Sequence, residues 1–345
     1  MRLEILDAAA IQDGGWAGSV LCHDVPGADG RPVLRKGHRL DVVDSAALSR
    51  AAPEELHIVW LGEEDVDENT AAIRLAQAVA GPGVEIHPPI ESQARLSAAG
   101  RGVARVDAAT LAAVNGVEGV TVFTIPDGAP VELGRTVAGV KITSLAIPGR
   151  ILEEAELTAA SAPHGPAVAV RGFLPLRVSA VVRRPIDPVA QQRFEASLRR
   201  RVDWFGGVVG SIECLDDRAA AEGALLTSAA NADLVIVVGL ATVDPLEGTW
   251  RGLLDIGAEV IRRGLPVHPG SSYWLVRLGG VPVIGVASCG MVSRRSALDL
   301  LLMRCFAGEP LDREYLASLG HGGLLQPEGS WRIPAYDRQV ETDER

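Results

Sequence analysis

The stretch DLVIVVGLATVD, residues 233–244, decides the fold. After Asp233 it is apolar at every position to Val238, and a glycine, Gly239, follows. A short run of this kind is typical of a strand buried on both faces, and such strands occur at the centre of parallel sheets. The small and polar residues after Val238 predict a loop at the carboxyl end of this strand, where open α/β sheets bind their ligands.

Strands and helices are predicted to alternate on both sides of this stretch. Helices are marked by caps and by prolines in the first turn, and strands by short apolar runs. Alternation with right-handed crossovers predicts a three-layer α/β/α domain. The expected order is strand 178–182, helix 188–204, strand 207–212, helix 216–230, strand 233–238, helix 249–257, strand 259–261, a hairpin turning at Gly279-Gly280, and helix 296–306.

The sequence before this domain predicts smaller β-rich domains. Short strands are expected at 19–22, 55–60, 102–106, 120–125 and 136–142, with a helix over 68–80 that Gly81-Pro82-Gly83 ends. We therefore expect an α+β segment at 1–83, a small β-rich domain at 84–150, the α/β/α domain at 172–310 and an extension at 311–345.

Composition restricts the class of protein. The chain has 345 residues, 47% of them hydrophobic, and a formal charge of −11. Such a charge disfavours general attraction to nucleic acid or to an anionic membrane. The four cysteines form no CxxC pair, which argues against a structural zinc site and suits a reducing compartment. No apolar run approaches the ~20 residues that cross a bilayer, so we expect a cytoplasmic protein.

Four loops are expected at the carboxyl edge of the predicted sheet, and the first is basic. Arg183 and Arg184 follow strand 178–182 and precede a helix. Two adjacent guanidinium groups at the start of a helix form an anion clamp. The alternative, which the sequence supports equally, is a solvated loop before a helix that begins at Pro188.

The second loop follows the central strand. Gly239, Leu240 and Ala241 would let backbone N–H groups approach a ligand, and Thr242 offers a hydroxyl. Asp244 is the candidate for positioning a metal ion or a polar ring edge. The alternative, favoured by spacing alone, is a turn in which Asp244 caps the next helix.

The third loop contains the turn Pro269, Gly270 and Ser271, preceded by His268. Its position before the predicted hairpin places it at the same edge. A lone histidine is more often structural than catalytic, so we include the turn among the binding candidates and not His268.

The fourth loop leads into the last helix of the domain. Ser288, Cys289, Gly290, Ser293 and Arg294 combine small residues, hydroxyls and a guanidinium group at a helix N-terminus, a composition suited to a phosphate. Cys289 is either a thiol of low pKa or a buried inert thiol, and the second interpretation is the commoner one.

Other sites are less well supported. The sequence has no GxxxxGK[ST], GxGxxG, HExxH or GxSxG motif. The acidic run 63–68 has ligands for a divalent ion, but a solvated helix entrance accounts for it as well.

Long stretches resemble the molybdopterin-binding domain of molybdopterin molybdotransferases (molybdenum insertases), molybdopterin adenylyltransferases and CinA-like proteins. They include GGVVGSIECL (206–215), ADLVIVVGLATVD (232–244), GAEVIRRGLPVHPG (257–270), VRLGGVPVIGVASCG (276–290) and SALDLLLMRCFAGEPL (296–311). GSVLCHDV (18–25) and VLRKGHRL (33–40) are similar to the first segment of the insertases. The likeness is greatest to the N-terminal part of molybdenum cofactor cytidylyltransferase fusion proteins, and it extends over residues 1–311.

The resemblance implies that the four loops bind molybdopterin or the molybdenum cofactor. In insertases the second loop reads SGG-S-G-x-x-D, so Gly239, the hydroxyl of Thr242 and Asp244 are carried over. The fourth-loop pattern PGNP appears here as Ala287-Ser288-Cys289-Gly290. An insertase would transfer molybdate to the dithiolene, with Mg²⁺ as a candidate ion beside Asp244, and would form a homodimer.

Three hypotheses follow from the resemblance. The first is an insertase-like transferase of molybdenum cofactor biosynthesis. The second is a non-catalytic carrier or sensor that serves a molybdenum hydroxylase or a nucleotidyltransferase. The third is a scaffold that has lost ligand binding and acts through its acidic surface.

Overall fold

The computed structural model describes residues 1–90, 92–163, 165–183, 185–215, 218–287, 295–325, 332–334 and 336. The chain divides into two compact units. Unit 1 comprises residues 1–99, 105–127 and 133–170, and unit 2 comprises 100–104, 128–132 and 171–345. The finer division into four segments stays a prediction. Within the described residues, none of the helices has the length and apolar character needed to cross a membrane.

The first part of unit 1 is a small α+β fold around a three-stranded sheet of order β1-β5-β2. Trp16, Leu21 and Leu48 lie at the centre of its core. Helix α2 is preceded by a 3-10 turn, η1. The elements are β1 (Arg2–Asp7), α1 (Ala8–Asp13), β2 (Val20–Leu21), β3 (Val25–Pro26), β4 (Pro32–Leu34), η1 (Val42–Asp44), α2 (Ser45–Ala51) and β5 (Glu55–Trp60).

The second part of unit 1 has a four-stranded sheet of order β10-β12-β8-β7. Helix α3 contacts β12 and β8, and α5 contacts α3 and α4. Residues four apart on α3, such as Ala71, Leu75 and Val79, are fully buried because they lie on one face of the helix. The elements are β6 (Asp65–Asp67), α3 (Glu68–Val79), β7 (Val84–Ile86), β8 (Gln93–Ala98), α4 (Ala108–Asn115), β10 (Val120–Thr124), β12 (Thr136–Ile142), β13 (Ala146–Pro148) and α5 (Gly149–Ala160).

A third small sheet has its strands in the order β11-β9-β14. Its strands are β9 (Gly102–Val106), β11 (Pro130–Val131) and β14 (Val168–Gly172).

Unit 2 is built on a six-stranded sheet of order β16-β15-β17-β20-β19-β18. The predicted central strand is β17, which is parallel to both neighbours, β15 and β20. The prediction of an α/β fold is therefore confirmed. The elements are β15 (Arg177–Arg183), α6 (Pro188–Trp204), β16 (Val208–Leu215), α7 (Arg218–Asn231), β17 (Leu234–Leu240), α8 (Gly248–Asp255), β18 (Glu259–Arg263), β19 (Trp274–Leu278), β20 (Val281–Ala287), α9 (Ala297–Phe306) and α10 (Arg313–Ser318).

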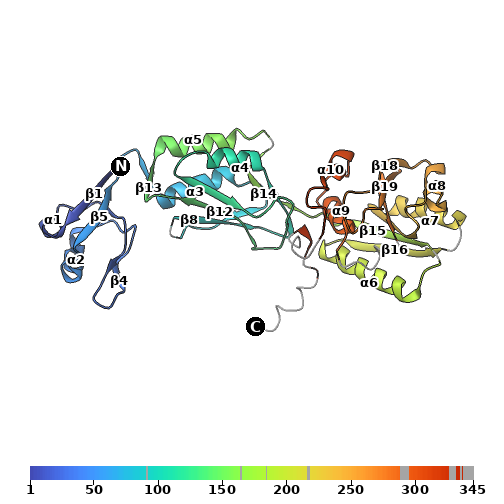
Figure 1. Ribbon diagram of the computed structural model, residues 1–345, viewed down its shortest axis with the longest axis horizontal. Helices are drawn as coiled ribbons and strands as arrows, with labels where there is room; N and C mark the ends of the chain where they lie inside the picture. The colour runs from blue at the N-terminus through green and yellow to red at the C-terminus, as the bar shows by residue number, and fades with distance from the viewer. Residues whose placement is uncertain are drawn as a thin grey trace. The chain divides into compact units, whose positions relative to one another are not determined.

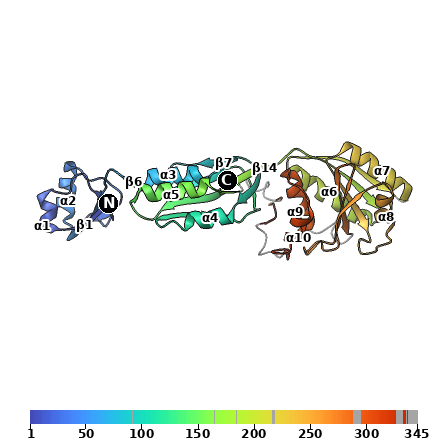
Figure 2. The same ribbon diagram turned by 90° about the horizontal axis from the view of Figure 1, so that it is seen from above.

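Alternate side chains of the central strand pack into two different cores. Ile236 belongs to a core with Leu198 of α6 and Leu301 of α9. Its neighbour Val237 belongs to another, with Leu225 of α7 and Leu253 of α8. Because successive side chains of a strand point to opposite faces, α6 and α9 cover one face and α7 and α8 the other. Figures 1 and 2 show these helices around the strands of unit 2.

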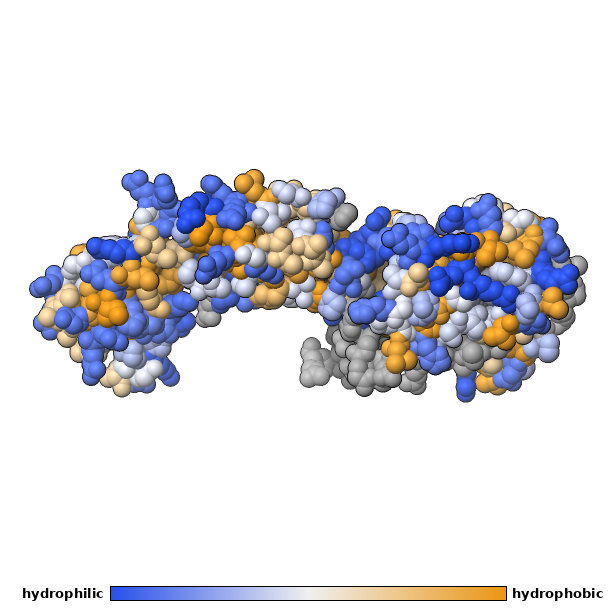
Figure 3. Space-filling view, turned by 45° about the horizontal axis from the view of Figure 1, so that its top comes forward, coloured by the Kyte–Doolittle hydropathy of each residue, from blue (hydrophilic) through white to orange (hydrophobic). Residues whose placement is uncertain are grey.

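The visible surface of unit 2 in Figure 3 is mostly hydrophilic, and the apolar residues on it form separate small spots. The large apolar side chains of the central strand are fully buried, among them Leu234, Ile236 and Val238. Burying them on both faces is the main stabilising contribution expected for such a sheet.

Candidate functional site

The carboxyl ends of the parallel strands meet at one edge of the sheet in unit 2. Val182 of β15 lies beside Cys214 of β16 and Val238 of β17, and Leu240 lies beside Ala287 of β20. The first, second and fourth candidate loops start from these strand ends. Open α/β sheets bind ligands at this edge because loops and helix N-termini converge there.

The third loop belongs to the same edge. It connects β18 to β19, and Arg263 at the end of β18 pairs with Trp274 at the start of β19. Trp274 in turn pairs with Gly285, near the carboxyl end of β20. All four predicted loops therefore begin or end at one edge of the sheet.

Gly239 brings the second loop against the first. Its φ is +82°, and a Cβ atom at this position would lie 2.3 Å from the carbonyl oxygen of Arg183. Both features favour glycine, because side chains rarely adopt the left-handed conformation and the close approach leaves no space for a Cβ atom. Arg183 is partly buried, while Arg184 lies outside the described residues.

The helix that follows the first loop begins where the sequence predicts. Asp187 caps α6 by accepting a hydrogen bond from the Ala190 N–H (2.9 Å), and Pro188 occupies the first turn. A hollow of about 820 Å³ lies here, lined by residues that include Pro185, Ile186 and Gln191. The anion-clamp role of the first loop stays a prediction.

The second loop forms a turn that is held by hydrogen bonds to its own backbone N–H groups. Thr242 is buried, whereas Ala241 and Asp244 are exposed. The Asp244 carboxylate accepts a hydrogen bond from the Leu246 N–H (2.8 Å). Glu247, not Asp244, caps α8 through the Trp250 N–H (2.8 Å). Asp244 thus stabilises a turn before the helix, and its role toward an ion stays a prediction, as does ligand binding by Leu240.

Arg263 is a basic residue of this edge that the sequence did not single out. Its guanidinium group lies 5.0 Å from the centroid of the Trp250 ring and donates to the carbonyl oxygen of Thr242 (3.3 Å). The side chain is exposed. The sequence could have pointed to Arg263, because it stands just after a predicted strand whose carboxyl end lies at the shared edge. A cation–π contact favours this position of the guanidinium group, so Arg263 places a cation beside the second loop.

The third loop packs against the start of α9. The Ala297 N–H donates to the carbonyl oxygen of Pro269 (2.9 Å). Gly270 has a φ of +121°, and a Cβ atom there would lie 2.5 Å from the Cβ of Ala297. Ser271 is exposed, and so is His268. The loop before β19 and the helix after β20 are therefore neighbours.

The fourth loop itself lies outside the described residues. This applies to Ser288, Cys289, Gly290, Ser293 and Arg294. The described elements on either side are β20, which ends at Ala287, and α9, which begins at Ala297. Its predicted binding role remains a prediction.

Helix α9 has a complete N-terminal cap. Ser296 accepts from the Leu298 N–H (3.3 Å), and Asp299 accepts from the Ser296 N–H (2.8 Å). This capping box fixes the first turn of α9.

The acidic run at 63–68 forms a helix entrance. Asp67 caps α3 through the N–H groups of Asn69 and Thr70, both at 3.1 Å. Asp65 accepts from the Gly62 N–H (2.8 Å) and pairs with the amino group of Met1 (2.6 Å), and these contacts hold the pKa of Asp65 below its usual value. Among the described residues, no group of three or more His, Cys, Asp or Glu is placed to hold a metal ion.

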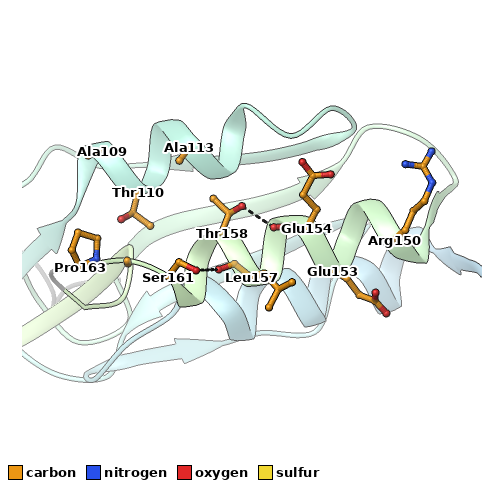
Figure 4. Close-up of a pocket in the computed structure, with 11 residues that line it drawn as sticks. Ala109, Thr110, Ala113, Arg150, Glu153, Glu154, Leu157, Thr158, Ser161 and Pro163 are labelled. Carbon is orange, nitrogen blue, oxygen red and sulfur yellow. Dashed lines mark hydrogen bonds between the residues drawn. The ribbon is translucent and has the colours of Figure 1, made fainter.

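Another hollow, of about 660 Å³, lies between α4 and α5 of unit 1 (Figure 4). Two of its hydroxyl groups are used within α5 or at its end. Thr158 donates to the carbonyl oxygen of Glu154 (2.7 Å), and Ser161 donates to that of Leu157 (2.7 Å). This hollow contains none of the candidate residues of the four loops.

Comparisons with known proteins give only weak similarity. No protein-family model matches the sequence, and no curated protein does. Two solved structures of MoeA molybdopterin biosynthesis proteins from Pyrococcus horikoshii are similar over most of the chain. One has 15% identity, covers 70% of this chain and 79% of its own, and has a TM-score of 0.30. The other has 11% identity, coverages of 90% and 76%, and a TM-score of 0.27.

A molybdenum cofactor biosynthesis protein from Pyrococcus furiosus has 10% identity, covers 91% of this chain and 66% of its own, and has a TM-score of 0.25. TM-scores of this size are too low to establish a shared fold.

Proposed function

We propose that the protein binds molybdopterin, or the molybdenum cofactor made from it, at the carboxyl edge of the unit 2 sheet, and acts in molybdenum cofactor biosynthesis. The binding domain would be the three-layer α/β/α domain expected from the sequence. The observation that carries the proposal is the contact of Gly239 with the Arg183 backbone. There a glycine in the left-handed region brings two of the four loops together.

The arrangement suits an anionic ligand in three respects. Backbone amides of a glycine-containing bend approach a ligand without an intervening side chain. The first turn of α9 adds the positive end of a helix dipole. Arg263, in contact with Trp250, adds a positive charge. These features support binding of the pterin phosphate at an edge that carries positive groups, although the whole chain is acidic.

In the insertase-like form of this proposal the chain transfers molybdate to the dithiolene of the pterin. The fourth loop and the second loop would hold the phosphate, and Asp244 would face the reacting end. Asp244 would orient the incoming oxyanion or an accompanying ion through its carboxylate.

One observation favours the second function, that of a non-catalytic carrier. The Asp244 carboxylate is already engaged by the Leu246 N–H at 2.8 Å, in a turn that it stabilises. This hydrogen bond already accounts for an aspartate at position 244, so no catalytic role is required to explain the residue. The carrier would bind the same ligand and release it to a molybdenum hydroxylase or a nucleotidyltransferase.

Co-purification tests the shared proposal. The protein is purified from a host that makes the cofactor, and bound pterin is released, oxidised and measured by fluorescence. We expect about one pterin per chain or a substantial fraction of that. If the purified protein contains no pterin and does not bind added molybdopterin, ligand binding is rejected and the scaffold hypothesis is supported.

Asp244→Ala separates the enzyme from the carrier. Molybdate-dependent conversion of molybdopterin to active cofactor is measured for the wild type and for the variant. An enzyme would lose turnover in Asp244→Ala and keep its affinity for molybdopterin. If the wild type binds molybdopterin but converts none, the carrier function is supported.

A further inference from the structure

A buried ion pair connects α6 to the first turn of α9. Nε of Arg201 donates to Oδ1 of Asp299 over 2.7 Å, and the two residues are 4% and 0% exposed. Arg201 also donates to the hydroxyl of Ser197. The other carboxylate oxygen of Asp299 accepts from the Ser296 N–H at 2.8 Å. Asp299 therefore fixes both the orientation of α9 toward α6 and the cap of α9.

The C-terminal segment adds a third donor to this carboxylate. The hydroxyl of Tyr336 donates to Oδ1 of Asp299 (3.0 Å), and the guanidinium group of Arg201 lies 5.5 Å from the Tyr336 ring centroid. The ring also lies near two aromatic side chains of the core, with centroid distances of 5.8 Å to Trp204 and 6.2 Å to Phe205. Tyr336 is thus anchored by its ring and by its hydroxyl.

The same segment holds the third loop. The His268 N–H donates to the carbonyl oxygen of Gly323 (2.8 Å), and the Leu325 N–H donates to that of His268 (2.9 Å). The guanidinium group of Arg332 donates to the carbonyl oxygens of His321 (3.1 Å) and Gly322 (2.9 Å). These bonds connect the turn at 319–325 to the residues near Tyr336. We call the turn, with residues 332–334 and 336, the strap.

We propose that the strap positions the candidate ligand site, with Tyr336 as its positioning residue, so that docking of the strap and binding of the ligand favour each other. This inference rests on the proposed function. Its basis is that the strap contacts the third loop at His268 and the first turn of α9 at Asp299, and these two elements contact each other through Pro269 and Ala297.

The strap would act on ligand affinity as supporting residues act around metal sites and active sites, where they orient the residues that contact the ligand. A group that fixes the rotamer and position of a binding element raises affinity without touching the ligand. If the ligand binds the ordered loops more tightly than the loosened ones, it must also stabilise the docked strap, because the coupling free energy is reciprocal. Tyr336 is therefore expected to influence affinity from outside the site.

Tyr336→Phe tests the inference in the full chain, with molybdopterin as the probe. Phe keeps the ring packing and removes only the hydrogen bond to Asp299. Ser318→Ala is the matched control, since the exposed Ser318 hydroxyl donates to the carbonyl oxygen of Tyr315 (2.8 Å) within the same C-terminal region. We expect Tyr336→Phe to weaken molybdopterin binding about fivefold to tenfold and Ser318→Ala to leave it unchanged.

Limited trypsin digestion of the wild type tests the reciprocal effect and does not depend on the folding of a variant. Saturating molybdopterin is expected to slow cleavage after Arg332 severalfold, with cleavage after the exposed Lys36 of unit 1 unaffected.

The outcomes separate the two proposals. Binding by the wild type with equal affinity in Tyr336→Phe, or equal cleavage after Arg332 with and without molybdopterin, overturns the strap and leaves the proposed function standing. Absence of molybdopterin binding in the wild type overturns both.

Discussion

The carbonyl oxygen of Arg183 lies where a side chain at Gly239 would begin, only 2.3 Å from the position of a Cβ atom. Arg183 ends β15 and Gly239 is the penultimate residue of the neighbouring parallel strand β17, and the first two candidate loops follow these strands. Their close approach couples the shapes of the two loops. Gly239 is therefore a position at which a small substitution should disturb two candidate loops together.

Gly239→Ala is expected to destabilise unit 2 by about 2–4 kcal/mol, because a left-handed backbone and a steric overlap with backbone act together. Molybdopterin affinity should fall by at least tenfold. Urea unfolding and equilibrium dialysis with molybdopterin measure the two effects.

Gly279→Ala is the matched control for this prediction. Gly279 also has a positive φ, +57°, but no atom lies within 4 Å of the position of its Cβ. It should cost about 1 kcal/mol and leave the affinity unchanged. Equal effects of the two substitutions would mean that the contact with Arg183 has no special importance.

The sheet of unit 2 could be predicted because its signals are local. The apolar run 234–238 marks a strand that is buried on both faces, and Pro188 marks the start of a helix. Strand β1 could not be recognised so easily, because Leu3 and Ile5 are 71% and 66% exposed. Their apolar character therefore does not indicate which side of the strand is buried.

The tertiary contacts around the candidate site could not be predicted from the local sequence. Arg201 is the last of three consecutive arginines, and its two neighbours in the run are exposed. Its partner Asp299 is 98 residues away. Nothing local distinguishes the buried arginine from the others, since helix rotation and long-range packing decide which one points inward.

Breaking the buried ion pair should be costly. Arg201→Met leaves the Asp299 carboxylate buried without its cation, and the expected loss is about 3–5 kcal/mol in the free energy of unfolding. The double variant Arg201→Met with Asp299→Leu removes both charges and should recover at least half of this loss. Urea unfolding of both variants measures the coupling. A double variant that is less stable than Arg201→Met would show that Asp299 acts mainly through its cap.

Arg263 offers a test of the charge at the shared edge. Arg263→Gln keeps part of the side-chain length and removes the charge, and should weaken molybdopterin binding by about 1.5–3 kcal/mol if the guanidinium group contacts the phosphate. The wild type should lose affinity for molybdopterin when the salt concentration is raised, and Arg263→Gln should lose less affinity over the same change in salt.

The comparison for Arg263 is Arg277→Gln. Arg277 is also exposed, but it lies on β19 opposite Pro282, toward the other end of the sheet. Its replacement should not change the affinity. If Arg277→Gln and Arg263→Gln weaken binding equally, the charge acts through the general field and not through a contact.

Cys305 should be chemically inert in the folded protein. Burial raises the pKa of its thiol to about 12, and the nearby Arg304 only partly opposes this effect. At pH 8 the thiolate population is then roughly four orders of magnitude below that of the thiol. Iodoacetamide labelling followed by peptide mapping should modify Cys305 slowly in native protein and rapidly in urea. Fast labelling without urea would contradict the packing of α9.

Alkaline pH should destabilise unit 2 through Tyr336. Burial raises the pKa of this phenol well above its usual value, and the adjacent Asp299 carboxylate raises it further, although Arg201 acts in the opposite direction. Because the folded pKa is the higher one, the phenol's contribution is complete below pH 10 and is lost as pH rises from about 10 toward the folded pKa. The wild type should therefore lose stability between pH 9 and pH 11. Tyr336→Phe, which cannot ionise at this position, should lose less stability over the same range. Urea unfolding at pH 9, 10 and 11 measures the difference, and parallel curves for the two proteins would show that the phenol does not bond to Asp299 in solution.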